Sequence, residues 1–391
     1  MSFFKPQKRI LGVDLGSSSI KLVELVKTEK GVELGTYGYA KFKAGDIKKD
    51  SALEQERSAV VLRNICKKAN IRSINAIASI PPFFVFSSII SIPKMQDKDI
   101  ESAVKWEAKK VIPLPLEQIE LKWKIINIKN DVNEDGLKKE VLDNKNQPKE
   151  EDNREYINHP QRQSGKNSGQ SEKKMQLLLT GAAKKIVQRY MEIFKRAGLN
   201  LYSLETESFA LGRSLLNKED NSVVMVVDVG ALNTNISLIK AGIPFLNRSV
   251  DVGAFTISKI IANSMNISVE RAEQFQNDIG ISVNNNNKET IPKIIEESLL
   301  TVLNEIKYCF NLYEDYKRSI LDPTDRIEKV VLCGGGAMIP NFPEYLSNLL
   351  NIKVYIGDPW VKVQYHEDLK LVLEEIGPNF SVAIGLAMRD L

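Results

Sequence analysis

The sequence predicts an α/β fold made of two similar halves, and three observations carry this prediction. An apolar run ends in Asp14-Leu-Gly16, which is followed by a polar turn and a second apolar run. The same order of features returns 214 residues later at Asp228-Val-Gly230. A further apolar run leads directly into three consecutive glycines, Gly334, Gly335 and Gly336. Repetition at this scale indicates a duplicated architecture.

The composition is that of an ordinary globular protein without a strong charge bias. A net charge of +4 over 391 residues argues against a dedicated nucleic-acid binder. No apolar run is long enough for a transmembrane helix, and the first residues lack the features of a signal peptide. Three scattered cysteines and two histidines favour reduced thiols in the cytoplasm and exclude a Cys/His metal site.

The first hairpin suits a phosphate-binding role. Residues 10–13 and 20–25 have the pattern of two strands, and the turn between them holds Asp14, Gly16 and three serines, Ser17, Ser18 and Ser19. Glycine lets the backbone approach a ligand, and turn N–H and hydroxyl groups can donate to phosphate oxygens. A carboxylate can hold a water on Mg²⁺. Taken alone, an ordinary hairpin with a polar turn explains this stretch equally well.

The rest of the first half alternates strands and helices. Strands are predicted at 32–42, 74–80, 83–92, 119–128, 176–183 and 201–204, and helices at 51–70, 97–111, 184–197 and 208–216. The elements from Pro93 to residue 128 form a small α+β unit inserted into the larger domain. Residues 129–174 contain too few apolar side chains to offset the entropy of ordering, which predicts a disordered insertion. That insertion is either a tolerated surface loop or a binding segment.

The second half repeats a three-stranded meander and then becomes helical. Two strands joined by a polar turn are predicted within 223–239, with further strands at 243–252, 327–332 and 354–356. Helices are predicted at 255–265, 269–277, 292–316, 342–350 and 380–388. The last helix carries small residues at Ala383, Gly385 and Ala387, a spacing that allows a second helix to approach closely. No P-loop sequence is present, and no Gly-x-Gly-x-x-Gly opens a helix, which leaves a dinucleotide-binding fold unsupported.

Three glycine-containing loops, each following an apolar strand, resemble the nucleotide motifs of the actin/Hsp70/sugar-kinase ATPase superfamily. Residues 10–25 are similar to its first phosphate motif, 226–239 to its second, and 330–339 to its adenosine motif. Residues 204–216 and 380–391 resemble its two connecting helices. The resemblance implies a duplicated actin-like (ribonuclease H-like) ATPase fold, with two lobes around a nucleotide cleft and the small α+β subdomain inserted into the first lobe.

The same resemblance implies a division of the chain into five segments. Residues 8–92 begin the first lobe, 93–183 form the inserted subdomain with its insertion at 129–174, 184–216 complete the first lobe, 217–379 form the second lobe, and 380–391 return to the first.

Within the superfamily the chain resembles the PilM family of actin-like proteins, which act in type IV pilus assembly. The matching stretches are residues 11–25, 92–115, 197–210 and 331–346. The Ile-Pro-Lys-Met…Trp-Glu segment within 92–115 is the most discriminating, because kinases and chaperones lack the inserted subdomain there. The division protein FtsA and the secretion protein GspL have related subdomains and are alternatives.

The resemblance implies ATP and Mg²⁺ as ligands. Asp14 and Asp228 would organise Mg²⁺ through water. The residues implied for the phosphates are Gly16, Ser17, Ser18, Ser19, Gly230, Asn233, Thr234 and Asn235, and those for the nucleoside are Gly334, Gly335, Gly336 and Ala337. Glu273 matches a ribose contact, although Gln276 stands where a lysine is common. Lys21 either reaches a phosphate or points to solvent.

Two glutamates are candidates for positioning a water against the terminal phosphate. Glu205 and Glu207 lie in the segment that matches the first connecting helix, and either could act there or merely cap that helix. The second phosphate loop has Leu232 and Asn233 where active relatives favour Gly and Thr. We therefore expect ATP binding with slow or absent turnover.

The implied role is a cytoplasmic scaffold that is held at the inner membrane through its partners. The partner implied is the N-terminal cytoplasmic tail of a PilN-like inner-membrane protein, bound as an extended segment near the inserted subdomain. Other pilus assembly components and a second copy of the chain are further partners that the resemblance allows. Proteins of the FtsA type usually have a membrane-targeting helix after the second connecting helix. This sequence stops at Leu391, directly after that helix, and we take this to count against the FtsA alternative. A small-molecule kinase would need a substrate-facing aspartate, for which no candidate is found.

Overall fold

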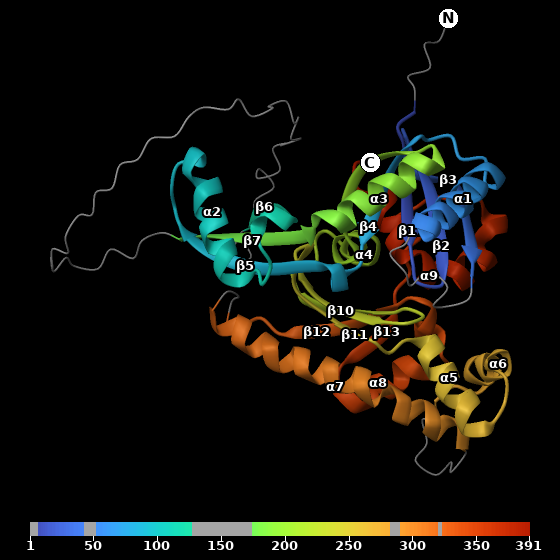
Figure 1. Cartoon of the computed structure of the whole chain (residues 1–391). Coiled ribbons are helices and arrows are strands. Elements are labelled where there is room, and N and C mark those ends of the chain that lie inside the picture. Colours follow the sequence, from blue (N-terminus) through green and yellow to red (C-terminus); the bar gives the residue numbers. More distant parts are fainter. Residues whose placement is uncertain (1–6, 43–51, 127–173, 282–289, 320–322) are drawn as a thin grey trace, which may run out of the picture.

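The computed structural model describes residues 7–42, 52–126, 174–281, 290–319 and 323–391, and it forms two lobes with a smaller unit at one side (Figure 1). The predicted disordered insertion lies outside the described residues, except for Lys174 at its end. Among the helices of the described ranges, none combines the length and the apolar character required to span a bilayer.

The first lobe is built on a five-stranded sheet with the order β3-β2-β1-β4-β8. Its strands are β1 (Arg9–Leu15), β2 (Ser19–Thr28), β3 (Gly31–Lys41), β4 (Asn75–Ile80) and β8 (Asn200–Thr206). The first three form an antiparallel meander, and β4 and β8 continue the sheet in parallel with β1. Strands β1 and β2 are buried along most of their length because helices cover both faces of the sheet.

The second lobe repeats this topology strand for strand. Its sheet has the order β11-β10-β9-β12-β13, with β9 (Val223–Val229), β10 (Thr234–Lys240), β11 (Ile243–Val250), β12 (Ile327–Cys333) and β13 (Lys353–Ile356). Again an antiparallel meander is followed by two parallel strands. The predicted duplication of the fold is therefore confirmed.

The inserted unit is a three-stranded antiparallel sheet with one helix on it. Strands β5 (Val85–Pro93), β6 (Ile119–Ile126) and β7 (Lys174–Ala183) are ordered β5-β7-β6. Helix α2 (Asp97–Val111) buries Ile100, Val104 and Ala108 against this sheet. A small α+β unit is therefore present as predicted, but it also contains β5, which precedes the predicted start at Pro93 because this strand pairs with β7.

The helices form three layers around the two sheets (Figure 1). Helices α1 (Ala52–Lys68) and α3 (Lys184–Ala197) cover the outer face of the first sheet. On the outer face of the second sheet lie α7 (Thr290–Ser319) and α8 (Phe342–Leu350), whereas α5 (Ala254–Met265) and α6 (Val269–Ile279) pack on each other and on α7. Between the sheets lie α4 (Glu207–Leu215) and α9 (Lys370–Ala387), whose apolar side chains pack on both.

Helices α4 and α9 approach each other as closely as two backbones allow. A Cβ atom on Gly385 would lie 1.9 Å from the carbonyl oxygen of Ala210, and one on Gly12 of β1 would lie 2.1 Å from the carbonyl oxygen of Ala383. The small residues of the last helix therefore serve the close packing that their spacing predicts.

Helix α9 begins ten residues before the predicted start at Phe380. The pair Gly377-Pro378 suggests a break, because proline lacks an N–H and crowds the preceding turn. Tertiary contacts sustain the helix through this point: the Trp360 ring packs on Gly377, and its Nε1 donates to the Leu373 carbonyl at 2.8 Å.

We predict that Gly385→Ala lowers the free energy of unfolding by about 1–3 kcal/mol, because the new methyl group overlaps the α4 backbone. Urea unfolding of the full chain measures this. Gly212→Ala, in the same pair of helices, is the matched control. A Cβ atom at Gly212 meets nothing nearer than 3.6 Å, and the exchange favours the helix by up to about 1 kcal/mol. Equal effects of the two variants would contradict the packing described.

Candidate functional site

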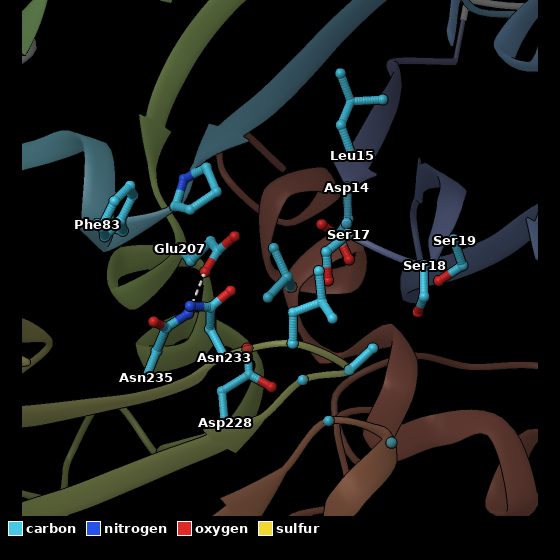
Figure 2. Close-up of a pocket in the computed structure, with 18 of the residues that line it drawn as sticks. Asp14, Leu15, Ser17, Ser18, Ser19, Phe83, Glu207, Asp228, Asn233 and Asn235 are labelled. Atoms are coloured by element: carbon cyan, nitrogen blue, oxygen red, sulfur yellow. Dashed lines mark hydrogen bonds between the residues drawn. The ribbon is translucent and has the colours of Figure 1, made fainter. Parts of the chain in front are cut away.

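A cleft of about 650 Å³ lies between the lobes where the two meanders face each other. It is lined by the β1–β2 turn, the β9–β10 turn, the glycine loop after β12, and the beginnings of α4 and α5. Figure 2 shows Asp14, Glu207 and Asp228 around one space, with the serine turn on one side and Asn233 and Asn235 on the other.

Asp14 and Lys21 form a buried ion pair on the first hairpin. They are directly opposite in the β1–β2 register, and Lys21 Nζ lies 2.9 Å from Asp14 Oδ2. Burial opposes the charge on Lys21, but the Asp14 carboxylate, together with Asp228 and Glu207, raises its pKa above the ordinary value. Lys21 thus points into the cleft and stays protonated, instead of extending to solvent.

Asp228 occupies the equivalent place in the second lobe. Burial, and then the charge of Asp14, raise the pKa of Asp228 from 3.8 to about 6, although Lys21 and a hydrogen bond from the Cys333 thiol oppose the shift. Gly334, which follows Cys333, has φ +81°, and a Cβ atom there would lie 2.3 Å from Asp228 Oδ1. Only glycine fits at this position, because both the backbone angle and the space exclude a side chain.

Glu207 is the first residue of α4 and is held from the opposite lobe. Asn235 Nδ2 donates to Glu207 Oε2 at 3.1 Å (Figure 2). The Ser249 hydroxyl in turn donates to Asn235 Oδ1 at 2.8 Å. Burial, with the charges of Asp14 and Asp228, raises the pKa of Glu207 well above its ordinary value.

Three carboxyl groups therefore surround one lysine in a desolvated space. Such an arrangement disfavours full ionisation until another cation enters, which suits a divalent metal ion delivered with a polyanion. Within the described ranges, no group of three or more His, Cys, Asp or Glu side chains is arranged to bind a metal directly. The donor set fits Mg²⁺ that retains its waters, with Asp14 and Asp228 accepting hydrogen bonds from them.

The structure brings most of the predicted site residues together. Those that line the cleft are Asp14, Gly16, Ser17, Ser18, Ser19, Lys21, Glu207, Asp228, Gly230, Asn233, Asn235, Gly334, Gly335 and Gly336. They come from both lobes, so the cleft exists only when the two sheets are in place.

Four predicted residues do not line the cleft. Glu205 is paired with Arg213 and Arg389, so its carboxylate is engaged elsewhere. Thr234 is fully buried and donates to the Val252 carbonyl at 2.7 Å. Ala337 is fully buried behind the glycine loop.

Glu273 also lies away from the cleft, on the exposed side of α6. Gln276, one turn further along α6, is buried and accepts a hydrogen bond from the Ser258 hydroxyl at 2.7 Å. A ribose contact from this helix thus has no geometric support.

Several cleft residues carry no sequence signal. Arg189 of α3 and Lys259 of α5 add two cations, Asn379 of α9 lies beside Gly335, and Phe83 borders the opening. These side chains reach the cleft through tertiary packing and belong to no motif, so spacing along the chain could not identify them.

The repeated sheets and the cleft between them define an actin-like ATPase fold. The sequence profile of the family described as Type IV pilus assembly protein PilM matches residues 12–143 and 162–391. The chain belongs to this family, which confirms the resemblance seen in the sequence.

Related proteins share this framework. Cell division protein FtsA of Bacillus subtilis is 23% identical over 198 residues, which cover 46% of this chain and 44% of that protein. FtsA of Borreliella burgdorferi is 25% identical over 234 residues, covering 54% and 53%. The chain thus spans about half the length of the curated relatives that it matches.

Two solved structures share the fold. A PilM-PilN type IV pilus biogenesis complex superposes with a TM-score of 0.74 and 22% identity, over 98% of this chain and 99% of that one. Ethanolamine utilization protein EutJ from Carboxydothermus hydrogenoformans gives a TM-score of 0.51 and 15% identity, over 98% and 91%.

We predict that Asp228→Asn stabilises the ligand-free protein at pH 7.5 by up to about 3 kcal/mol. The folded protein keeps a proton on Asp228 up to a pH of about 6, whereas the ordinary value is 3.8. The unfolded chain therefore binds fewer protons between these values, and stability falls as the pH rises through that window. Urea unfolding from pH 4 to 8 measures the slope, which the substitution should flatten.

Asp220→Asn is the matched control, because it should act in the opposite direction. Burial disfavours the Asp220 charge, but hydrogen bonds from Lys329 and Ser222 lower its pKa overall. Its contribution is present above its ordinary pKa and is lost as the pH falls, so Asp220→Asn should destabilise at pH 7.5. Destabilisation by Asp228→Asn at pH 7.5 would contradict the interpretation that the Asp228 charge is unfavourable in the ligand-free cleft.

Proposed function

We propose that this chain binds ATP with Mg²⁺ in its cleft and acts as a cytoplasmic scaffold in type IV pilus assembly. The observation that supports this proposal most strongly is that Asp14 and Asp228 face the same desolvated space from the two lobes, with Lys21 beside them. The family establishes the pilus-assembly context. The ligand, its metal and the scaffold role are our inference from the chemistry of the cleft.

The phosphates would lie between the two hairpin turns. The serines after Gly16 offer hydroxyl and N–H donors from the first lobe, and Asn233 offers an amide from the second. Lys21, Arg189 and Lys259 supply positive charge around the same space. Bound Mg²⁺ would neutralise phosphate charge, and Asp14 and Asp228 would fix its waters.

The nucleoside would lie against the glycine loop after β12. A Cβ atom on Gly336 would lie 2.3 Å from Val229 Cγ1, and one on Gly335 would lie 2.8 Å from Asn379 Oδ1. Gly336 therefore admits no side chain, and one at Gly335 would displace the Asn379 amide, so the backbone of this wall is available to a planar base.

Turnover should be slow. Glu207 is the carboxyl group nearest in role to a general base, but burial and the charges of Asp14 and Asp228 raise its pKa, which favours the protonated form, and Asn235 holds it in place. A protonated carboxyl group cannot accept a proton from water. Leu232 adds an apolar side chain to the cleft beside the second phosphate turn.

The partner that we propose is the N-terminal cytoplasmic tail of a PilN-like inner-membrane protein. The similar solved structure is a PilM-PilN complex, which supports this choice. The inserted subdomain exposes Trp106 (66%), Leu114 (50%) and Ile125 (53%), which offer apolar contacts to an extended segment. Such docking would hold the chain at the inner membrane.

An FtsA-like filament protein is the second candidate, because two FtsA proteins match about half of this chain. Sedimentation with Mg·ATP separates the candidates: a filament protein pellets in a concentration-dependent way, and a tail-binding scaffold stays in the supernatant.

We predict that Asp14→Asn and Asp228→Asn each weaken Mg·ATP binding at least tenfold, because each removes a negative charge and replaces one of the two oxygens that can accept from metal-bound water with an NH₂ donor. Titration with a fluorescent ATP analogue, with and without EDTA, measures this. Glu205→Gln is the control, since Glu205 pairs with Arg213 and Arg389 outside the cleft. Equal nucleotide affinity of the wild type with and without Mg²⁺ would refute the metal-dependent site.

We also predict that a synthetic PilN-like tail binds the full chain and that Trp106→Ala weakens this binding about tenfold or more. Fluorescence anisotropy with and without Mg·ATP measures it and shows whether nucleotide changes the affinity. Tyr308→Ala is the control, since Tyr308 is also exposed but lies on α7 of the second lobe. An unchanged affinity in Trp106→Ala would move the docking site away from α2.

A further inference from the structure

The outer surface of the first lobe is formed by α1 and α3, which lie side by side on one face of the sheet (Figure 1). Arg196 of α3 ties them together, through bonds to Glu56 of α1 at 2.9 Å and to Glu192 of α3 at 2.7 Å. Because both helices bury their apolar sides in the same core, their exposed sides form one surface. We refer to the exposed residues of these two helices as the α1–α3 face.

The α1–α3 face is strongly basic, although the chain as a whole is nearly balanced at +4. Helix α1 exposes Arg57, Arg63, Lys67 and Lys68. Helix α3 exposes Lys184, Lys185 and Lys195.

The carboxylates of these two helices, both described in full, are fewer than the cations and are buried or bonded to Arg196. Glu54 is buried, and Glu56 and Glu192 are half-buried and bonded to Arg196. The positive charge of the face is therefore not balanced within it.

Exposed aliphatic side chains lie among these cations. Leu53 is 69% exposed, Val60 38% and Met191 57%. On α1, Leu53, Arg57 and Val60 are spaced by three or four residues, so they share one stripe of the helix. On α3, Met191 lies seven residues after Lys184 and four before Lys195, so these three also share one stripe of the helix.

We propose that the α1–α3 face binds directly to a bilayer containing acidic phospholipids. Clusters of four to eight Lys and Arg residues are attracted to such membranes, and aliphatic side chains beside them can enter the headgroup boundary. A nucleic acid would use the cations and leave Leu53 and Met191 without a role. A protein partner would favour clustered apolar anchors, whereas these are separated by charges. Charge complementarity and this mixture therefore favour the lipid surface.

This inference is independent of the proposed nucleotide and tail sites. The α1 and α3 residues that line the cleft, such as Ser58 and Tyr190, are on the inner sides of the helices, and none of the exposed cations is among them. Substitutions on the face should leave Mg·ATP binding unchanged, so the two proposals can fail separately.

The test is flotation of the full chain with vesicles of phosphatidylcholine alone or mixed with phosphatidylglycerol. The variant Arg57→Gln/Lys67→Gln/Lys184→Gln/Lys195→Gln removes four charges from the face. The control Lys94→Gln/Lys98→Gln/Lys109→Gln/Lys307→Gln removes four exposed charges elsewhere, so both have the same net charge. At about fivefold per residue, the face variant should lose more than a hundredfold in affinity for acidic vesicles, and the control should bind nearly as the wild type does.

Two further measurements complete the test. High salt should release the wild type, because screening weakens attraction to the surface. Leu53→Ser/Met191→Ser should weaken binding with the salt dependence kept. Circular dichroism and Mg·ATP titration verify folding of each variant.

Equal vesicle binding by the face variant and its control would overturn the proposal. So would equal binding of the wild type to neutral and acidic vesicles. Retention by RNA or polyglutamate without flotation on acidic vesicles would reassign the face to another class of partner.

Discussion

The contact between Gly385 of α9 and Ala210 of α4 is the constraint on which the rest of the structure depends. These helices form the one layer that packs on both sheets, so their separation sets the distance between the lobes. Both also deliver cleft residues, since α4 begins with Glu207 and α9 carries Asn379. The Gly334 N–H donates to the Pro378 carbonyl at 2.9 Å, which fixes the glycine loop to α9. The close packing of α4 and α9 therefore also determines where the cleft residues lie.

The carboxyl groups of the cleft lower the stability of the ligand-free protein, and we expect the same groups to favour binding of a cation. Asp14, Glu207 and Asp228 gather in one space, where burial and then their mutual repulsion raise the pKa values of Glu207 and Asp228. A protein selected for stability alone would not concentrate these groups, and sites with strongly shifted pKa values are often functional. The mechanism that we propose turns this repulsion into affinity for a cation carried by a polyanion.

Local features of the sequence were sufficient to predict the sheets and part of the cleft. Asp14 and Asp228 stand at the ends of apolar strands, before turns whose residues are adjacent along the chain, so their neighbourhood follows from sequence. Glu205 and Glu207 could not be separated in this way, because the change from strand to helix at Thr206 decides which one faces the cleft. Lys259 and Arg189 reach the cleft only through the packing of whole helices. The continuity of α9 across Pro378 likewise depends on Trp360, a residue outside this helix that bonds to the Leu373 carbonyl.

The packing of α9 against β1 has a consequence for biosynthesis. Gly12 lies directly against the α9 backbone, yet 355 positions separate Leu15 from Lys370. At about 5–20 residues per second, a ribosome needs roughly 20–70 seconds to pass from one to the other. During that interval Val23 and Leu25, which pack against apolar residues of α9 in the folded protein, lack these contacts. We therefore expect the nascent first lobe to expose these apolar side chains, the kind of surface that chaperones bind, until α9 has been synthesised.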